Sequence, residues 1–87
     1  MIFYEGNRML DLLQTETKFV GLNQSTRALR DGAVRAAYIA RDADSHVVSP
    51  FERLCKEKAV TIVYVDTMKE MAELCGVDVP TAVAVVL

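Results

Sequence analysis

The run "AVAVVL", from Ala82 to Leu87, constrains the fold of this chain more than any other segment. It carries no charge, and its valines favour an extended backbone. A strand of this composition has no polar side to turn towards water, so it suits a central strand of a sheet or a strand that is otherwise covered. The rest of the chain must therefore provide the strands and helices that bury it.

Three further segments have the composition of strands. They are short and largely apolar, and one of them is rich in β-branched residues. The predicted strands cover residues 17–22 ("TKFVGL"), 36–41 ("AAYIAR") and 61–65 ("TIVYV"). Together with the run at 82–87, they predict a sheet of four strands.

Helices are predicted between these strands. Apolar side chains at roughly helical spacing indicate a first helix over about residues 3–14. Asn23, a favoured N-cap residue, marks the start of a second helix that runs to about Asp31 and ends at Gly32.

Two capping boxes mark the remaining helix starts. Ser49 and Glu52 have capping-box spacing, and Pro50 then occupies the first helical position, where its missing N–H costs nothing. Thr67 and Glu70 repeat the box before a last helix that stops at Gly76.

Strands that alternate with helices of about ten residues indicate helices on both faces of one sheet. We therefore predict a three-layer α/β/α sandwich. A chain of 87 residues has room for a single core, so residues 1–87 are expected to form one domain.

Composition narrows the function. The two cysteines, Cys55 and Cys75, are far apart and fall on the apolar sides of predicted helices, so we expect buried thiols and no metal site. No apolar run approaches the roughly 20 residues that span a bilayer, and the N-terminus lacks the pattern of a signal peptide, which predicts a cytoplasmic protein without a membrane partner.

The net charge of −2 argues against generic polyanion binding, but basic residues are concentrated locally. Between residues 21 and 35, three arginines accompany a single acidic residue, Asp31. An anion site is therefore expected near this stretch.

The first candidate site lies at the start of the second predicted helix. Asn23 and Gln24 precede Arg27 by four and three residues, so the three side chains share one end of one helix face. They have an ordinary interpretation, in which Asn23 caps the helix and the other two are solvated. They also suit a nucleic-acid contact, because a helix N-terminus favours phosphate and amides pair with base edges.

The second candidate is the loop "GVDVPTA", which contains Val77, Asp78 and Val79. Its valines either tuck back onto the domain or form a small apolar surface for a base or a partner. The loop can lie beside Asn23 only if the first and last strands run antiparallel, which predicts a mixed four-stranded sheet.

Enzymatic motifs are lacking. Asp42 and Asp44 follow a strand, as metal ligands often do, but no P-loop or further ligand accompanies them, so solvated turn residues or caps are the simpler interpretation. A lone His46 is weak support for a general base. We predict a non-enzymatic protein with no cofactor.

The run "GLNQSTRALRDGAVRAAYIARDAD" resembles the kink-turn RNA-binding family of ribosomal proteins, the L7Ae and L30e group, and especially its short ribosome-associated bacterial members. The resemblance continues through "FERLCKEKAVTIVYV" and "MKEMAELCGVDVPTAVAVVL", from about Lys18 to Leu87. The order and spacing of these segments carry the resemblance, since no single motif is decisive.

The resemblance implies a role for each candidate residue. Asn23 and Gln24 would meet guanine edges of tandem G·A pairs, Arg27 a phosphate or a base edge, and Gly21 would allow close approach of the backbone. Val77, Asp78 and Val79 would pack on an extruded bulge nucleotide. The full set of implied RNA-binding residues is Gly21, Asn23, Gln24, Arg27, Arg30, Val77, Asp78 and Val79.

One residue departs from the family pattern, which has a glutamate where this chain has Gln24. An amide offers one acceptor and two donors, so the pairing scheme of a carboxylate cannot be copied unchanged. The expected partner is structured RNA containing a kink-turn, in rRNA or a riboswitch, bound by a monomer that associates with the ribosome. The alternative is a protein–protein interaction module on the same fold.

Overall fold

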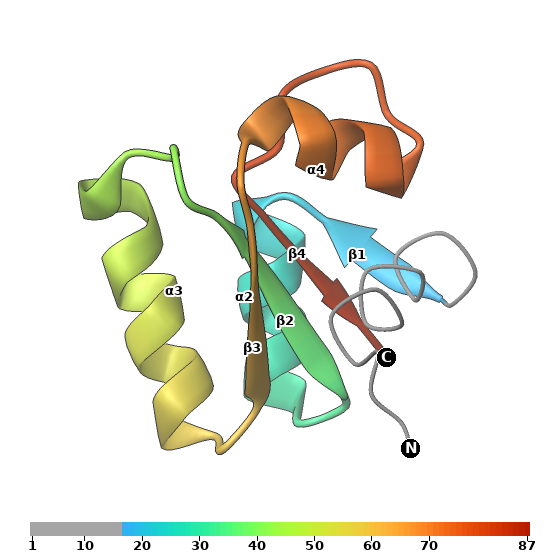
Figure 1. The fold of residues 1–87 in the computed structure, drawn as a ribbon. Helices are drawn as coiled ribbons and strands as arrows, with labels where there is room; N and C mark the ends of the chain where they lie inside the picture. The colour runs from blue at the N-terminus through green and yellow to red at the C-terminus, as the bar shows by residue number, and fades with distance from the viewer. Residues whose placement is uncertain (1–16) are drawn as a thin grey trace, which may run out of the picture.

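A computed structural model describes residues 17–87 (Figure 1). The helix predicted over about 3–14 lies outside this range. Strands and helices alternate along the described part of the chain. Their bounds are β1 Lys18–Val20, α2 Leu22–Asp31, β2 Ala36–Ala40, α3 Ser45–Glu57, β3 Thr61–Val65, α4 Met68–Cys75 and β4 Val83–Val86.

The four strands form one mixed sheet in the order β1-β4-β2-β3. β2 and β3 are parallel, whereas β4 runs antiparallel to both of its neighbours, β1 and β2. The prediction for the C-terminal run is confirmed, because β4 is a central strand and all four of its residues are buried. The predicted antiparallel pairing of the first and last strands is confirmed as well.

Helices cover both faces of the sheet (Figure 1). α2 and α3 pack on one face, where Leu29, Phe51 and Cys55 meet alternate residues of β2 and β4. α4 packs on the other face, where Met71 and Cys75 join the other residues of the same strands. Successive strand residues point to opposite faces, so two fully apolar strands can supply both cores. The predicted three-layer sandwich is confirmed.

The start of α3 corrects the prediction from sequence. Asp44 caps the helix by accepting a hydrogen bond from the His46 N–H at 2.8 Å, so the helix begins at Ser45 and not at Pro50. Pro50 lies inside the helix, where its exposed ring leaves one backbone carbonyl without its usual partner. The Ser49 and Glu52 pair has the spacing of a capping box, but the helix has already started five residues earlier, at the cap that Asp44 provides.

The other helix boundaries follow the sequence more closely. Gly32 and Gly76 adopt the left-handed conformation and end α2 and α4, as predicted. The Thr67 side chain accepts a hydrogen bond from the Glu70 N–H at 3.0 Å, which confirms the second capping box as the start of α4. Within residues 17–87, no helix is long and apolar enough to cross a membrane.

Candidate functional site

Several chain segments meet at one end of the sheet, which we call the rim: residues 20–24, 40–44, 65–68 and 77–83. The Gly21 N–H, after β1, donates to the Val83 carbonyl at the start of β4, at 3.0 Å. The Ala40 N–H, at the end of β2, donates to the Ala82 carbonyl at 2.9 Å. The start of α2 and the end of the 77–82 loop therefore lie on the same side of the molecule, as the prediction for this site required.

The α2 start differs from the prediction. Gly21, and not Asn23, is the N-cap residue, with φ 98° and ψ 160°, and no side chain caps the helix. This backbone conformation is essentially restricted to glycine, and it lets β1 turn into α2 through the single residue Gly21. Asn23 is consequently the second helical residue, and its amide is not used for capping.

Asn23 and Gln24 are both exposed at this helix tip. The next residue, Ser25, is buried and donates its hydroxyl hydrogen to the Phe19 carbonyl at 3.3 Å, while its N–H donates to the Gly21 carbonyl. One side of the first turn is thus fixed to β1. The two amides are held on a rigid support and face water.

Arg27 and Arg30 follow on the exposed side of α2, one and two turns from the tip. They line a groove of about 880 Å³ between α2 and α3. Both helices begin at the rim, so the groove starts there, between Asn23 on α2 and His46 on α3, and runs towards the helix C-termini.

Sequence reasoning missed the α3 side of this groove. His46, Pro50, Arg53 and Glu57 line it, and they are spaced four, three and four residues apart. That spacing marks a single helix face. The helix predicted from sequence began at Pro50 and left out His46, so this helix face could be recognised only with the start of α3 placed at Asp44.

The loop between α4 and β4 supports both interpretations of its valines. Val77 is half-buried against the core beneath α4, whereas Val79 is 65% exposed. The loop is fastened at its end, because the Thr81 hydroxyl donates to the Val79 carbonyl at 3.1 Å and the Thr81 N–H donates to the Met68 carbonyl. Val79 and the exposed Asp78 are therefore available to a ligand, and Val77 is mainly structural.

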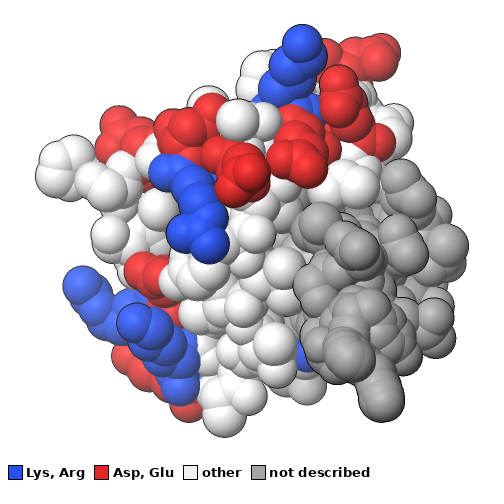
Figure 2. All heavy atoms as spheres, in the orientation of Figure 1, with Lys and Arg blue, Asp and Glu red and all other residues white. Residues whose placement is uncertain are grey.

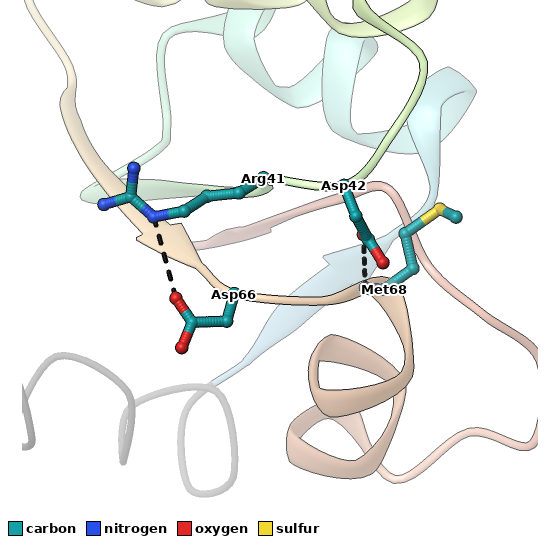
Figure 3. A network of polar contacts seen from close by, with 4 residues as sticks. All are labelled: Arg41, Asp42, Asp66 and Met68. Carbon is teal, nitrogen blue, oxygen red and sulfur yellow. Dashed lines mark hydrogen bonds and ion pairs between the residues drawn. The ribbon is translucent and has the colours of Figure 1, made fainter.

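Asp42 and Asp44, the candidate catalytic or metal-binding carboxylates, serve as structural acceptors. Figure 3 shows the Asp42 side chain directed at the start of α4, where it accepts a hydrogen bond from the Met68 N–H at 2.8 Å. Beside it, Arg41 Nε lies 3.7 Å from Asp66 Oδ1 in an exposed ion pair (Figure 3). Among residues 17–87, no group of three or more His, Cys, Asp or Glu side chains is arranged to hold a metal ion.

Charge is unevenly distributed at this end of the molecule. Figure 2 shows acidic side chains gathered across the upper part of the visible face, from the region where α3 begins to the region of α4 in Figure 1. The first turn of α4 contains Glu70, whereas the first turn of α2 contains no acidic residue. An anionic ligand is therefore favoured at the α2 side of the rim and disfavoured at the α4 side.

The buried titratable groups belong to the two cores. Burial raises the pKa of the Cys55 thiol to about 11 and that of the Tyr38 phenol to about 12, and it also raises the pKa of Cys75. Both cysteines are free, which confirms the predicted buried thiols. A raised pKa lowers the population of the reactive thiolate at neutral pH, as is typical of structural cysteines in a core.

Comparison with known proteins adds independent information. Residues 6–87 match the sequence profile of the ribosomal protein L7Ae/L30e/S12e/Gadd45 family. The RNA-binding protein TTE2299 of Caldanaerobacter subterraneus is 45% identical over 67 residues, which cover 77% of this chain and 82% of that protein. The RNA-binding protein BH0128 of Halalkalibacterium halodurans is 38% identical over 63 residues, or 72% of this chain and 77% of that protein.

The fold also matches a solved structure. The 15.5kD RNA binding protein of Giardia lamblia superposes with a TM-score of 0.81 and 25% sequence identity, over 99% of this chain and 77% of that one. The common architecture is an α/β fold with a mixed four-stranded sheet.

Proposed function

Because this chain belongs to the ribosomal protein L7Ae/L30e/S12e/Gadd45 family, a non-enzymatic family, we propose that it binds structured RNA through its rim and that the RNA contains a kink-turn. Relatives named as RNA-binding proteins support the general function. The kink-turn and the residues that contact it are our inference.

The observation that carries the proposal is the tip of α2. Its first turn has no side-chain cap and no acidic residue, and the exposed amides of Asn23 and Gln24 stand beside its N–H groups. Unpaired N–H groups and the helix dipole favour phosphate, and amides can both donate to and accept from base edges. Irregular RNA exposes such edges, whereas a regular A-form helix hides them.

The remaining contacts are assigned by position. Arg27, one turn from the tip, reaches a phosphate or a base edge, and Gly21 has no side chain to obstruct the backbone. Val79 offers an exposed apolar surface for an extruded nucleotide, with Asp78 beside it. Val77 supports this loop from below, because its side chain packs on the core.

Binding at this surface would act on the RNA by population shift. The contacts are complementary to the bent form and not to the extended form, so the protein stabilises the bend by its difference in affinity for the two. Gln24, in place of the family's glutamate, alters the hydrogen-bonding pattern and therefore the base preference at one position.

The test is fluorescence energy transfer across a labelled kink-turn duplex in buffer with little magnesium. Addition of the protein is expected to raise the transfer. Asn23→Ala and Arg27→Ala should each weaken the apparent affinity, by about tenfold if one good hydrogen bond or charge contact is lost. Lys58→Ala serves as the matched control, because it removes a positive charge at the far end of α3.

An unchanged transfer signal on titration would contradict kink-turn binding. Unchanged affinity in both Asn23→Ala and Arg27→Ala, with binding intact, would place the contact surface elsewhere. The natural target, rRNA of the ribosome or a riboswitch, can be identified by sequencing the RNA that crosslinks to the rim in cells.

A further inference from the structure

The groove between α2 and α3 extends well beyond the tip of α2. From Asn23 to Arg30, the α2 wall rises about 10 Å, at 1.5 Å per residue. Arg53 stands on the opposite wall, on the face of α3 that also carries His46. The three arginines of the groove, Arg27, Arg30 and Arg53, thus come from two consecutive helices.

These arginines are not engaged by the protein. Within residues 17–87, Arg27, Arg30 and Arg53 form no ion pair, and all three are exposed. The acidic residues of the groove, Asp31 and Glu57, lie at the C-terminal ends of the two helices. The arginines therefore line the groove from one turn below the tip of α2 to its last turn, where Arg30 precedes Asp31, and the acidic residues that line the groove lie at the end away from the rim.

We propose that this groove holds the sugar–phosphate backbone of one RNA strand as it leaves the rim, with Arg30 and Arg53 on opposite sides of it and His46 at its entrance. The inference rests on the proposed function, because RNA bound at the rim is what brings a strand to the entrance. It adds α3 to the contact surface, which otherwise consists of α2 and the 77–79 loop.

The dimensions and chemistry of the groove suit this ligand. A stretch of about 10 Å is longer than the spacing between consecutive phosphates of one strand, so the groove can hold more than one phosphate. Guanidinium groups donate paired hydrogen bonds to phosphate oxygens. Of the apolar residues that line the groove, Leu22 and Val47 lie near the entrance, Pro50 is exposed one turn farther along α3, Leu54 is half-buried and Phe51 is buried. The exposed apolar surface is therefore concentrated towards the entrance, and the exposed guanidinium groups of Arg30 and Arg53 beyond it suit phosphate.

The experiment measures the affinity of Arg53→Gln, Arg30→Gln and wild-type protein for kink-turn RNA over a range of salt concentrations. Three RNAs are compared. The first has two long helical arms, and each of the other two has one of these arms shortened so that it ends at the bend. Lys69→Gln is the matched control, because it removes one exposed charge from α4 on the opposite face of the sheet. Circular dichroism melting confirms that each variant folds.

Each groove variant is expected to bind the long-arm RNA about 3- to 10-fold more weakly at low salt, with the salt slope reduced by about 1. If the groove holds the strand of one arm, shortening that arm should make the affinities of Arg53→Gln and wild type equal, whereas shortening the other arm should leave them different. Lys69→Gln should have the wild-type affinity for all three RNAs. The bent state reached at saturation should be the same for all proteins.

Unchanged affinity and salt slope of Arg53→Gln on every RNA would overturn the inference. Failure of the proposed function has a different signature. If wild-type protein does not bend the kink-turn but Arg53→Gln still weakens binding to the long-arm RNA, the groove is supported and the kink-turn is rejected.

Discussion

α2 and α4 begin at the same end of the sheet, but their first turns are completed in opposite ways. In α4, Thr67 accepts a hydrogen bond from the Glu70 N–H, and Asp42 accepts one from the Met68 N–H. In α2, the N-cap is Gly21, and no side chain caps the helix. The protein thus uses the donors of α4 for its own structure and leaves those of α2 to solvent or a ligand.

This difference indicates that, at the rim, the start of α4 contributes to stability and the start of α2 is available for binding. Capping a helix start contributes about 1 kcal/mol to stability, so leaving α2 uncapped has a cost that the fold must offset elsewhere. The buried Leu29 and Ala28, and the anchoring of Ser25 to Phe19, hold α2 in place instead.

Gly21→Ala should destabilise the protein by about 3 kcal/mol, because its φ of 98° and ψ of 160° are essentially forbidden to alanine. A Cβ at this position meets no atom within 4 Å, so the cost arises from the backbone alone. Gly76→Ala at the end of α4 is the control, and its left-handed conformation should cost only about 1 kcal/mol. Denaturant unfolding measures both, and equal costs would show that the β1–α2 junction relaxes easily.

Thr67→Ala should lower the free energy of unfolding by about 1 kcal/mol, because it removes the cap of α4. Asn23→Ala should change it by less than about 0.5 kcal/mol, since Asn23 caps nothing. The effects on RNA affinity should be reversed, with a clear loss in Asn23→Ala and little change in Thr67→Ala. A large loss of stability in Asn23→Ala would contradict the view that α2 starts without a side-chain cap, because the amide would then have a structural role.

The buried thiols on the two faces of the sheet should affect stability in the same way, unlike the starts of α2 and α4. Cys55 lies under one face and Cys75 under the other, and burial raises the pKa of both thiols above their ordinary value. A raised pKa in the folded state contributes stability that is complete below the pKa of the unfolded thiol and is lost as the pH rises towards the folded value. The sign is therefore a decrease of stability with increasing pH.

Between pH 7 and pH 9, the loss should be at most about 0.8 kcal/mol for each thiol. It can be measured by denaturant unfolding across this range, with the double variant Cys55→Ala and Cys75→Ala as the reference. The double variant should show a shallower pH dependence than wild type. An identical pH dependence would mean that the thiols titrate alike in the folded and unfolded chains.

The sandwich could be predicted because its strongest determinants are local in the sequence. The uncharged run at 82–87 specified a central strand, and the alternation of strands and helices specified the layers. The capping box at Thr67 and the terminating glycines Gly32 and Gly76 were also readable, because a hydrogen bond to the next turn or a left-handed residue depends on few neighbours.

The helix starts at the site were harder to predict, because they depend on distant partners or on competition between nearby caps. Gly21 begins α2 while its N–H is bonded to Val83, more than sixty residues away. Asp44 and Ser49 are both good capping residues, and the sequence does not show which one starts α3. Arg53 escaped notice for the same reason, since its relation to Arg30 depends on how α2 and α3 pack.

The position of β4 between β1 and β2 also bears on when the rim can form during synthesis. Among the described residues, β1 pairs with no strand other than β4, and Gly21 depends on Val83 for its backbone partner. A nascent chain that has released β1, α2 and β2 from the ribosomal tunnel therefore still has no rim. That surface is assembled only after residues 83–86 emerge and pair with β1, so the amides of α2 acquire their supported geometry after the preceding strands and helices have been released.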